Sequence, residues 1–289
     1  MTSVLQPRFA LNHMAAPKLP VADFFALSAS LGCTEVEIRN DLAGNAILDG
    51  TTPDAIRAAA AKYGQKIITI NALQRFNDWS DTRAAQAEDL ARWCAATGAA
   101  ALILVPKNDG TGTADGERQA NLRTALRGLA PILQRHGILG FVEPLGFEIC
   151  SLRRKSEAAE AIADLQLSNL FRLTHDTFHH HLAGEDAIFP DLTGLVHISG
   201  VTDPAVDAAD MRDSHRVLVD AQDRVGNIAQ IRRLLAAGVT APCSFEPFAA
   251  KVHNSTTLAT DVSASMNYIR AAIGSSETTA LPQAGFRGR

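Results

Sequence analysis

Residues 137–144 read GILGFVEP, an apolar run that ends on a glutamate and a proline. Three later segments repeat this plan of an apolar run that stops at a polar side chain: residues 171–178 (FRLTHDTF), 195–200 (LVHISG) and 243–248 (CSFEPF). Short runs of this kind are typical of strands that are buried on both faces of a parallel sheet. We therefore predict four successive buried strands here.

Strand-like and helix-like segments alternate along the whole chain. The predicted strands are residues 9–12, 35–39, 66–72, 101–106, 137–144, 171–178, 195–200 and 241–248. The predicted helices are residues 21–31, 52–63, 80–97, 116–136, 156–164, 230–237 and 258–272, with Ser80 and Ser156 as N-caps. Eight strands that alternate with helices indicate an α/β fold, a single (β/α)8 TIM barrel. The alternative, an open doubly wound sheet, lacks a GxGxxG turn after any strand.

Length and composition agree with one catalytic domain. The chain has 289 residues, which matches a barrel of ~250 residues with additional ends. Its hydrophobic content of 46% is ample for a large core. We expect the barrel to span residues 1–273, and a loose tail rich in Ser, Thr and Gly to span residues 274–289.

Charge and cysteine usage limit the kinds of binding partner and the cellular compartment that we expect. The net charge of −4 gives no reason to expect nucleic acid or an acidic membrane as a partner. No secretory signal is visible, and no apolar run approaches the ~20 residues that span a bilayer. Cys33, Cys94, Cys150 and Cys243 are scattered, as is typical of buried reduced thiols. We expect a cytoplasmic protein that binds a small molecule. The sequence leaves open whether the protein forms a homo-oligomer.

One polar residue stands at the end of each of the last four predicted strands. These residues are Glu143, Asp176, His197 and Glu246. In a parallel barrel the C-terminal ends of the strands meet at one rim, so the four side chains are expected to converge. A proline follows each glutamate, and because proline has no N–H to donate, it is expected to end the strand there. Each acid alone fits an ordinary surface loop, but the four together predict a metal site.

Three carboxylates and one imidazole form a hard, oxygen-rich ligand set. Such a set suits one divalent metal ion per chain, Mn²⁺ first and also Mg²⁺, Co²⁺ or Zn²⁺. Structural zinc sites carry several Cys, and none stands at these strand ends. A divalent ion could polarise a ketone and its neighbouring hydroxyl and so ease the formation of an enediolate. Glu143 and Glu246 could then move protons as base and acid.

Three further polar residues are candidates for substrate binding. Arg39 ends the segment EVEIR and Asn71 lies in TINA, so both stand at predicted strand ends. Arg216 follows the long irregular stretch after residue 198, where a guanidinium would pair with a substrate oxygen or with a ligand carboxylate. For Arg216 an ordinary surface salt bridge is the alternative.

The tract THDTFHHH (residues 174–181) holds four histidines. His179 is expected to contact the substrate from beside the metal. His175 precedes Asp176 by one residue, so strand alternation turns it toward the helix layer. His180 and His181 carry no assigned role.

The segments EVEIR, TINALQRFND, FVEPLG, HDTFHHH, VHISG, HRV and SFEPF together resemble the xylose-isomerase-like barrel superfamily of sugar isomerases, epimerases and endonuclease IV. Within it, the likeness is closest to the inosose (2-keto-myo-inositol) isomerases. The resemblance implies that Glu143, Asp176, His197 and Glu246 are the metal ligands and that both glutamates also transfer protons. It further implies a keto-polyol or keto-sugar as substrate and a place in inositol or carbohydrate metabolism.

Several reactions remain open within this resemblance. An inosose dehydratase or a ketose 3-epimerase would use the same site, and a sugar-binding barrel would keep the pocket without catalysis. Many members carry a Pro-Gly-x-Gly turn shortly after the arginine, whereas here Arg216 leads into VLVDAQDRVGN.

An endonuclease IV-like phosphodiesterase is the least favoured alternative. That enzyme binds three metals through additional histidines at strand ends, where this chain has Arg39, Asn71 and Pro106. Asp213 and His215, however, echo its extra ligand pair and could hold a second ion with His179.

Overall fold

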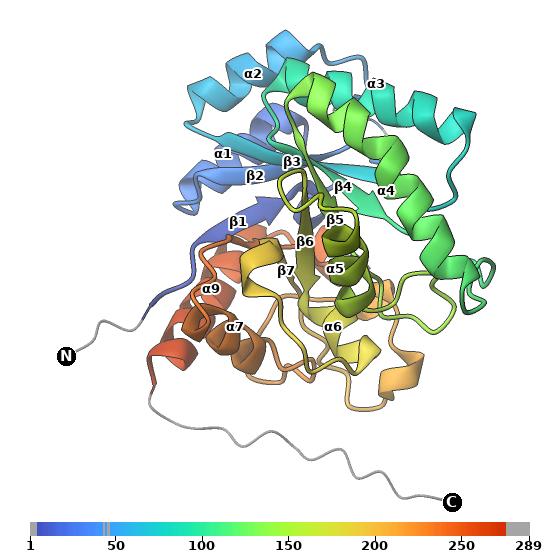
Figure 1. Cartoon of the computed structure of the whole chain (residues 1–289). Coiled ribbons are helices and arrows are strands. Elements are labelled where there is room, and N and C mark those ends of the chain that lie inside the picture. The colour runs from blue at the N-terminus through green and yellow to red at the C-terminus, as the bar shows by residue number, and fades with distance from the viewer. Residues whose placement is uncertain (1–4, 43, 45–46, 276–289) are drawn as a thin grey trace, which may run out of the picture.

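Eight parallel strands close into a barrel in the computed structural model, which describes residues 5–42, 44 and 47–275 (Figure 1). Each strand pairs with its neighbour in the chain, and β1 pairs with β8 to close the sheet. The strands are β1 (Phe9–Asn12), β2 (Glu35–Arg39), β3 (Lys66–Gln74), β4 (Ala101–Val105), β5 (Leu139–Val142), β6 (Phe171–Asp176), β7 (Thr193–Ile198) and β8 (Cys243–Phe245). The predicted α/β fold, a single (β/α)8 TIM barrel, is confirmed.

Helices surround the barrel (Figure 1). They are α1 (Val21–Ser30), α2 (Pro53–Lys62), α3 (Asp81–Thr97), α4 (Glu117–His136), α5 (Lys155–Asp164), α6 (Thr177–Ala183), α7 (Asn227–Ala236), α8 (Ala250–His253) and α9 (Leu258–Gly274). Short 3-10 turns are η1 (His13–Ala15), η2 (Pro190–Leu192), η3 (Ala208–Asp210) and η4 (Asp213–His215). The helices bury apolar stripes, as α4 does with Leu122, Leu126, Leu129 and Leu133 at helical spacing.

The inside of the barrel is apolar at one level and polar above it. Its apolar floor is one cluster of side chains: Ala10, Ile68, Ala72, Ala101, Ile103, Phe141 and Leu195. Two residues further along the chain from Ala10, Phe141 and Leu195 stand Asn12, Glu143 and His197. Because side chains alternate along a strand, residues two apart point into the same interior. The floor therefore supports a layer of polar groups at the C-terminal rim.

The boundaries of the elements differ in places from the prediction. The strand predicted over residues 171–178 ends at Asp176, because the Asp176 side chain accepts a hydrogen bond from the backbone N–H of His179 and caps α6, a helix that was not predicted. Ser80 caps α3 as predicted. The prediction that Ser156 caps the helix over residues 156–164 is wrong, since that helix, α5, begins one residue earlier at Lys155.

Most of the predicted tail, residues 276–289, lies outside the described residues, and the domain limits remain a prediction. All four cysteines are free and buried, as expected. Among the described residues, every helix is too short or too polar to cross a membrane.

Candidate metal centre

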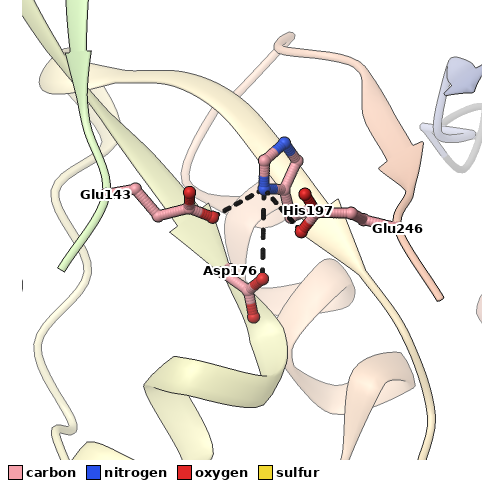
Figure 2. Close-up of side chains that lie close together, drawn as sticks. All are labelled: Glu143, Asp176, His197 and Glu246. Carbon is pink, nitrogen blue, oxygen red and sulfur yellow. Dashed lines mark hydrogen bonds and ion pairs between the residues drawn. The ribbon is translucent and has the colours of Figure 1, made fainter. Parts of the chain in front are cut away.

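The four predicted ligands converge at the C-terminal rim of the barrel (Figure 2). Glu143 follows β5, Asp176 ends β6, His197 lies in β7 and Glu246 follows β8. One ligand atom from each residue lies within 4.8 Å of the others, and all four side chains are buried. The predicted convergence of these four side chains at one rim is therefore observed.

His197 stands at the centre of the quartet. Its Nδ1 atom lies 2.6 Å from an oxygen of Glu143, 3.2 Å from one of Glu246 and 3.9 Å from one of Asp176. Figure 2 shows the three carboxylates directed toward this single nitrogen. An imidazole nitrogen and three carboxylate oxygens in such proximity are a donor set that fits a hard or borderline divalent cation.

The Glu-Pro sequences explain how the two glutamates reach this position. The backbone N–H of Glu143 still donates to Leu104 in β4 at 3.1 Å, and that of Glu246 donates to Ile198 in β7 at 3.0 Å. The prolines that follow have no N–H, so the ladder stops after each glutamate. Each glutamate is thereby the last residue of its segment that is hydrogen-bonded to the neighbouring strand, which fixes the position of its side chain.

Arg216 reaches the rim from a long excursion of the chain. Gly200 and Val217 form an antiparallel bridge with two 2.8 Å hydrogen bonds, which returns the loop to the end of β7. The Arg216 guanidinium then lies 2.6 Å from Asp176 and 3.1 Å from Glu246. Of the two partners that the sequence left open for Arg216, the structure shows the ligand carboxylate, and the alternative of a surface salt bridge is wrong because the side chain is 1% exposed.

Arg39 and Asn71 also bond to carboxylates of the polar layer. Arg39 Nη1 lies 2.7 Å from Glu246, and the rest of its guanidinium binds Asp41. Asn71 Nδ2 donates to Glu37 at 2.9 Å. Both side chains therefore organise the site from within, and their role in binding substrate stays a prediction.

Burial and charge act against each other at the metal centre. Burial raises the pKa of Glu246 to about 7 in spite of the nearby His197 and Arg216. Burial would also raise the pKa of Asp176, but Arg216, His179 and His197 together outweigh burial and hold that pKa well below its usual range. For His197 burial opposes protonation, yet the carboxylates of Glu246, Glu37 and Glu143 raise its pKa well above the ordinary value. Such a concentration of buried negative charge would be offset by a divalent cation.

A cavity of about 350 Å³ opens above the quartet. Six of the predicted site residues line it: Arg39, Asn71, Glu143, His179, Arg216 and Glu246. His179 is 4% exposed, and its Nδ1 atom has no hydrogen-bond partner among the described residues. A buried nitrogen left unpaired at a cavity wall is available to a ligand.

The model of the xylose isomerase-like TIM barrel family matches residues 25–272. The chain belongs to the xylose isomerase-like TIM barrel family. The resemblance that the sequence motifs carry is thereby confirmed at the level of the family. No curated protein matches the chain significantly.

Solved structures place this family member among barrels of the same kind. A xylose isomerase domain containing protein from Salmonella typhimurium LT2 is 31% identical, with a TM-score of 0.85 over 94% of this chain and 99% of that one. The IolI protein, solved with a zinc atom, is 18% identical with a TM-score of 0.81 over 92% and 97%. A D-psicose 3-epimerase from Clostridium cellulolyticum H10 is 16% identical with a TM-score of 0.70 over 92% and 99%. The last two share the fold.

The second metal ion considered for an endonuclease-like member of the family finds no support. Asp213 bonds Arg216 at 3.2 Å, and His215 Nδ1 accepts the backbone N–H of Arg212 at 3.0 Å. Among residues 5–42, 44 and 47–275, the quartet is the one group of three or more such side chains that could hold an ion. Asp213 and His215 therefore bond within the loop, and with His179 they form no such group among the described residues.

Two further histidines of residues 174–181, His175 and His180, contact residues of the surrounding helices. His175 is buried, with Nε2 at 2.9 Å from the Gln230 side chain in α7, as strand alternation predicts. His180 Nδ1 lies 2.6 Å from the amine of Lys155. Neither residue lines the cavity above the quartet.

Glu37 was not predicted as a site residue. It is completely buried in β2 and lies 3.0 Å from Nε2 of His197, on the side of the ring that faces away from the quartet. A signal for it exists in the sequence, because EVEIR places Glu37 and Arg39 two residues apart and hence on one face of the strand. Once Arg39 is assigned to the interior of the barrel, the same assignment follows for Glu37.

Proposed function

We propose that this protein is a metal-dependent isomerase of a keto-polyol or keto-sugar, with inosose (2-keto-myo-inositol) as the first candidate substrate. The observation that carries the proposal is the pair Glu143 and Glu246, which follow β5 and β8, line one cavity and both lie within 3.2 Å of His197 Nδ1. Two carboxylates that face one pocket suit the transfer of a proton between adjacent carbons of one substrate.

The quartet would hold the cation, Mn²⁺ by preference, through Glu143, Asp176, His197 and Glu246. When bound, the ion supplies Lewis acidity to a ketone and its neighbouring hydroxyl. The IolI protein, which shares the fold, binds a zinc atom in its crystal structure, so Zn²⁺ belongs in any test.

The proton transfer is assigned to the two glutamates. One glutamate removes the proton from the carbon beside the ketone, and the electron pair of that C–H bond forms the C=C bond of an enediolate. The other glutamate gives a proton to the former carbonyl carbon. As the new carbonyl forms at the adjacent carbon, its hydroxyl proton passes to the oxygen of the former carbonyl, which becomes a hydroxyl, so the substrate is rearranged without gain or loss of atoms.

His179 and Arg216 are assigned to substrate binding. Both residues line the cavity, and the Nδ1 atom of His179 has no hydrogen-bond partner among the described residues. Each can donate a hydrogen bond to a substrate oxygen, and a fixed donor at the developing enediolate oxygen stabilises its charge. The cavity volume of about 350 Å³ suits a single sugar or cyclic polyol.

The test is an assay of inososes and ketohexoses with the protein loaded with Mn²⁺ or Zn²⁺, with products identified by chromatography and mass spectrometry. An isomerase gives a product of unchanged mass with the carbonyl moved, and an epimerase gives one of unchanged mass with the carbonyl in place. Loss of water would assign a dehydratase. Metal analysis that found two or three ions per chain, with cleavage of a phosphodiester, would overturn the proposal.

A further inference from the structure

The imidazole of His197 is held from both sides. Its Nδ1 atom faces the three ligand carboxylates, as described above, whereas its Nε2 atom lies 3.0 and 3.1 Å from the two oxygens of Glu37. Both side chains are 0% exposed. Glu37 is therefore placed to fix the ring that the ligand set depends on, without being a member of that set.

Glu37 is itself held by donors from two other strands. Thr69 Oγ1 donates to it at 2.6 Å and Asn71 Nδ2 at 2.9 Å, both from β3. Ser244 Oγ in β8 donates at 2.5 Å. Three donors leave the carboxylate little freedom to turn, so its remaining acceptor capacity is directed at the imidazole.

We propose that Glu37 is a positioning residue that accepts the Nε2–H of His197 and thereby leaves the Nδ1 lone pair free for the metal. This inference rests on the metal centre of the proposed function. A neutral imidazole carries its one proton on either nitrogen. A proton on Nδ1 would point into the quartet and block ligation, whereas a proton on Nε2 satisfies the buried acceptor Glu37.

The same contact strengthens His197 as a ligand. A carboxylate that accepts the second N–H of a ligating histidine fixes the orientation of its ring and raises its basicity. The approach from β2 matters here, because none of the four ligands comes from that half of the barrel. Glu37 thus links the first strands of the chain to a ligand set formed by the last four.

The first experiment compares the Zn²⁺ affinity of wild type and Glu37→Gln by competition with a chromophoric chelator. We expect the dissociation constant to rise by about 10- to 100-fold, the usual effect of removing such a partner. Glu35→Gln is the matched control, since Glu35 lies on the same face of β2 but pairs with Arg8 at 3.1 Å, at the other end of the strand. Its dissociation constant should equal that of wild type.

The second experiment needs no variant. Nitrogen-15 NMR of the Zn²⁺-loaded wild type reports which ring nitrogen of His197 is protonated. We expect a proton on Nε2 and ligation through Nδ1; the opposite assignment overturns the inference. An unchanged affinity in folded Glu37→Gln would also overturn it and leave the proposed function intact. If wild-type protein with the intact quartet binds no divalent ion, both fall.

Discussion

At the scale of single residues, the site is an arrangement of buried charges that stabilise one another. Glu246 contacts His197, Arg216 and Arg39, each within 3.2 Å. Removal of one member leaves the others desolvated and unpaired, and that usually costs more than the pair contributed. The arginines of the rim are therefore expected to be important for folding as well as for substrate binding.

Arg216→Ala tests this expectation. The change leaves buried Asp176 without its guanidinium partner and leaves Glu246 with Arg39 alone, so we expect the free energy of unfolding of metal-free protein to fall by about 3–5 kcal/mol. Chemical denaturation measures it, with Arg127→Ala on the exposed face of α4 as the control, expected to change stability by about 0.5 kcal/mol or less. Equal stability of the two variants would show that Arg216 does not hold the carboxylates.

The ligand residues could be predicted because each ends an apolar run, and that pattern is local. The partners of Arg39, Asn71 and Arg216 could not, because they depend on which side chains meet across the closed barrel. Arg39 and Glu246, for example, are 207 positions apart and form a 2.7 Å ion pair. Nothing in the neighbourhood of either residue in the sequence indicates that contact.

At the scale of elements, α6 is held against the loop after β5. A Cβ atom built on Gly146 would lie 2.2 Å from the backbone oxygen of His179 and 2.7 Å from Cβ of Leu182. The glycine is therefore required for close approach of the two segments. Because α6 carries His179 to the cavity wall, the packing at Gly146 also sets the position of a proposed substrate-binding group.

Gly146→Ala is expected to displace α6. We expect a loss of stability of about 1–3 kcal/mol from overpacking and a rise in KM, because α6 carries His179. Gly274→Ala is the control, since its added Cβ would meet only Gln6 at 3.7 Å. If KM and stability match those of wild type, the loop and α6 are not coupled through this contact.

The short turn η1 is expected to make folding sensitive to acid. His13 is buried against the ring of Phe24, at a centroid distance of 4.2 Å, and its Nε2–H donates to Leu19 O at 2.9 Å. Burial lowers the pKa of His13 to about 4, an effect that Arg39 reinforces and that Leu19 O and Asp49 oppose. The unfolded chain, with a pKa of about 6.5, then binds the proton more readily than the folded protein.

Stability that depends on neutral His13 is therefore present above about pH 6.5 and is lost as the pH falls from there toward about 4. Between about pH 7 and about pH 5 the free energy of unfolding should fall less for His13→Gln than for wild type, with a difference on the order of 2 kcal/mol. Denaturation curves of both proteins at the two pH values measure it. Parallel loss in the two proteins would show that His13 is not the group responsible. The structure of η1 was not predicted, since residues 14–20 carry no periodic pattern.

At the scale of the whole molecule, the order of strands and helices determines where the four predicted ligands lie. Alternating strands and helices predict the barrel, and a parallel barrel brings the ends of β5 to β8 to one rim, so the fold and the ligand set follow from the same pattern. The reaction does not follow from it, because the loops above the rim take courses that depend on contacts between distant residues, as the loop before Arg216 depends on the bridge between Gly200 and Val217.

The central claim is that Glu143 and Glu246 move a carbon-bound proton of a keto-polyol. The most direct measurement is deuterium incorporation from D₂O into inososes and ketohexoses, read by mass spectrometry, for wild type, Glu246→Gln and the exposed control Glu160→Gln, each with its metal content confirmed. Wild type and Glu160→Gln should label a substrate at equal rates, and Glu246→Gln should be slower by about 100-fold or more. Equal labelling by metal-loaded Glu246→Gln, or no labelling of any of these substrates by wild type, would contradict the account.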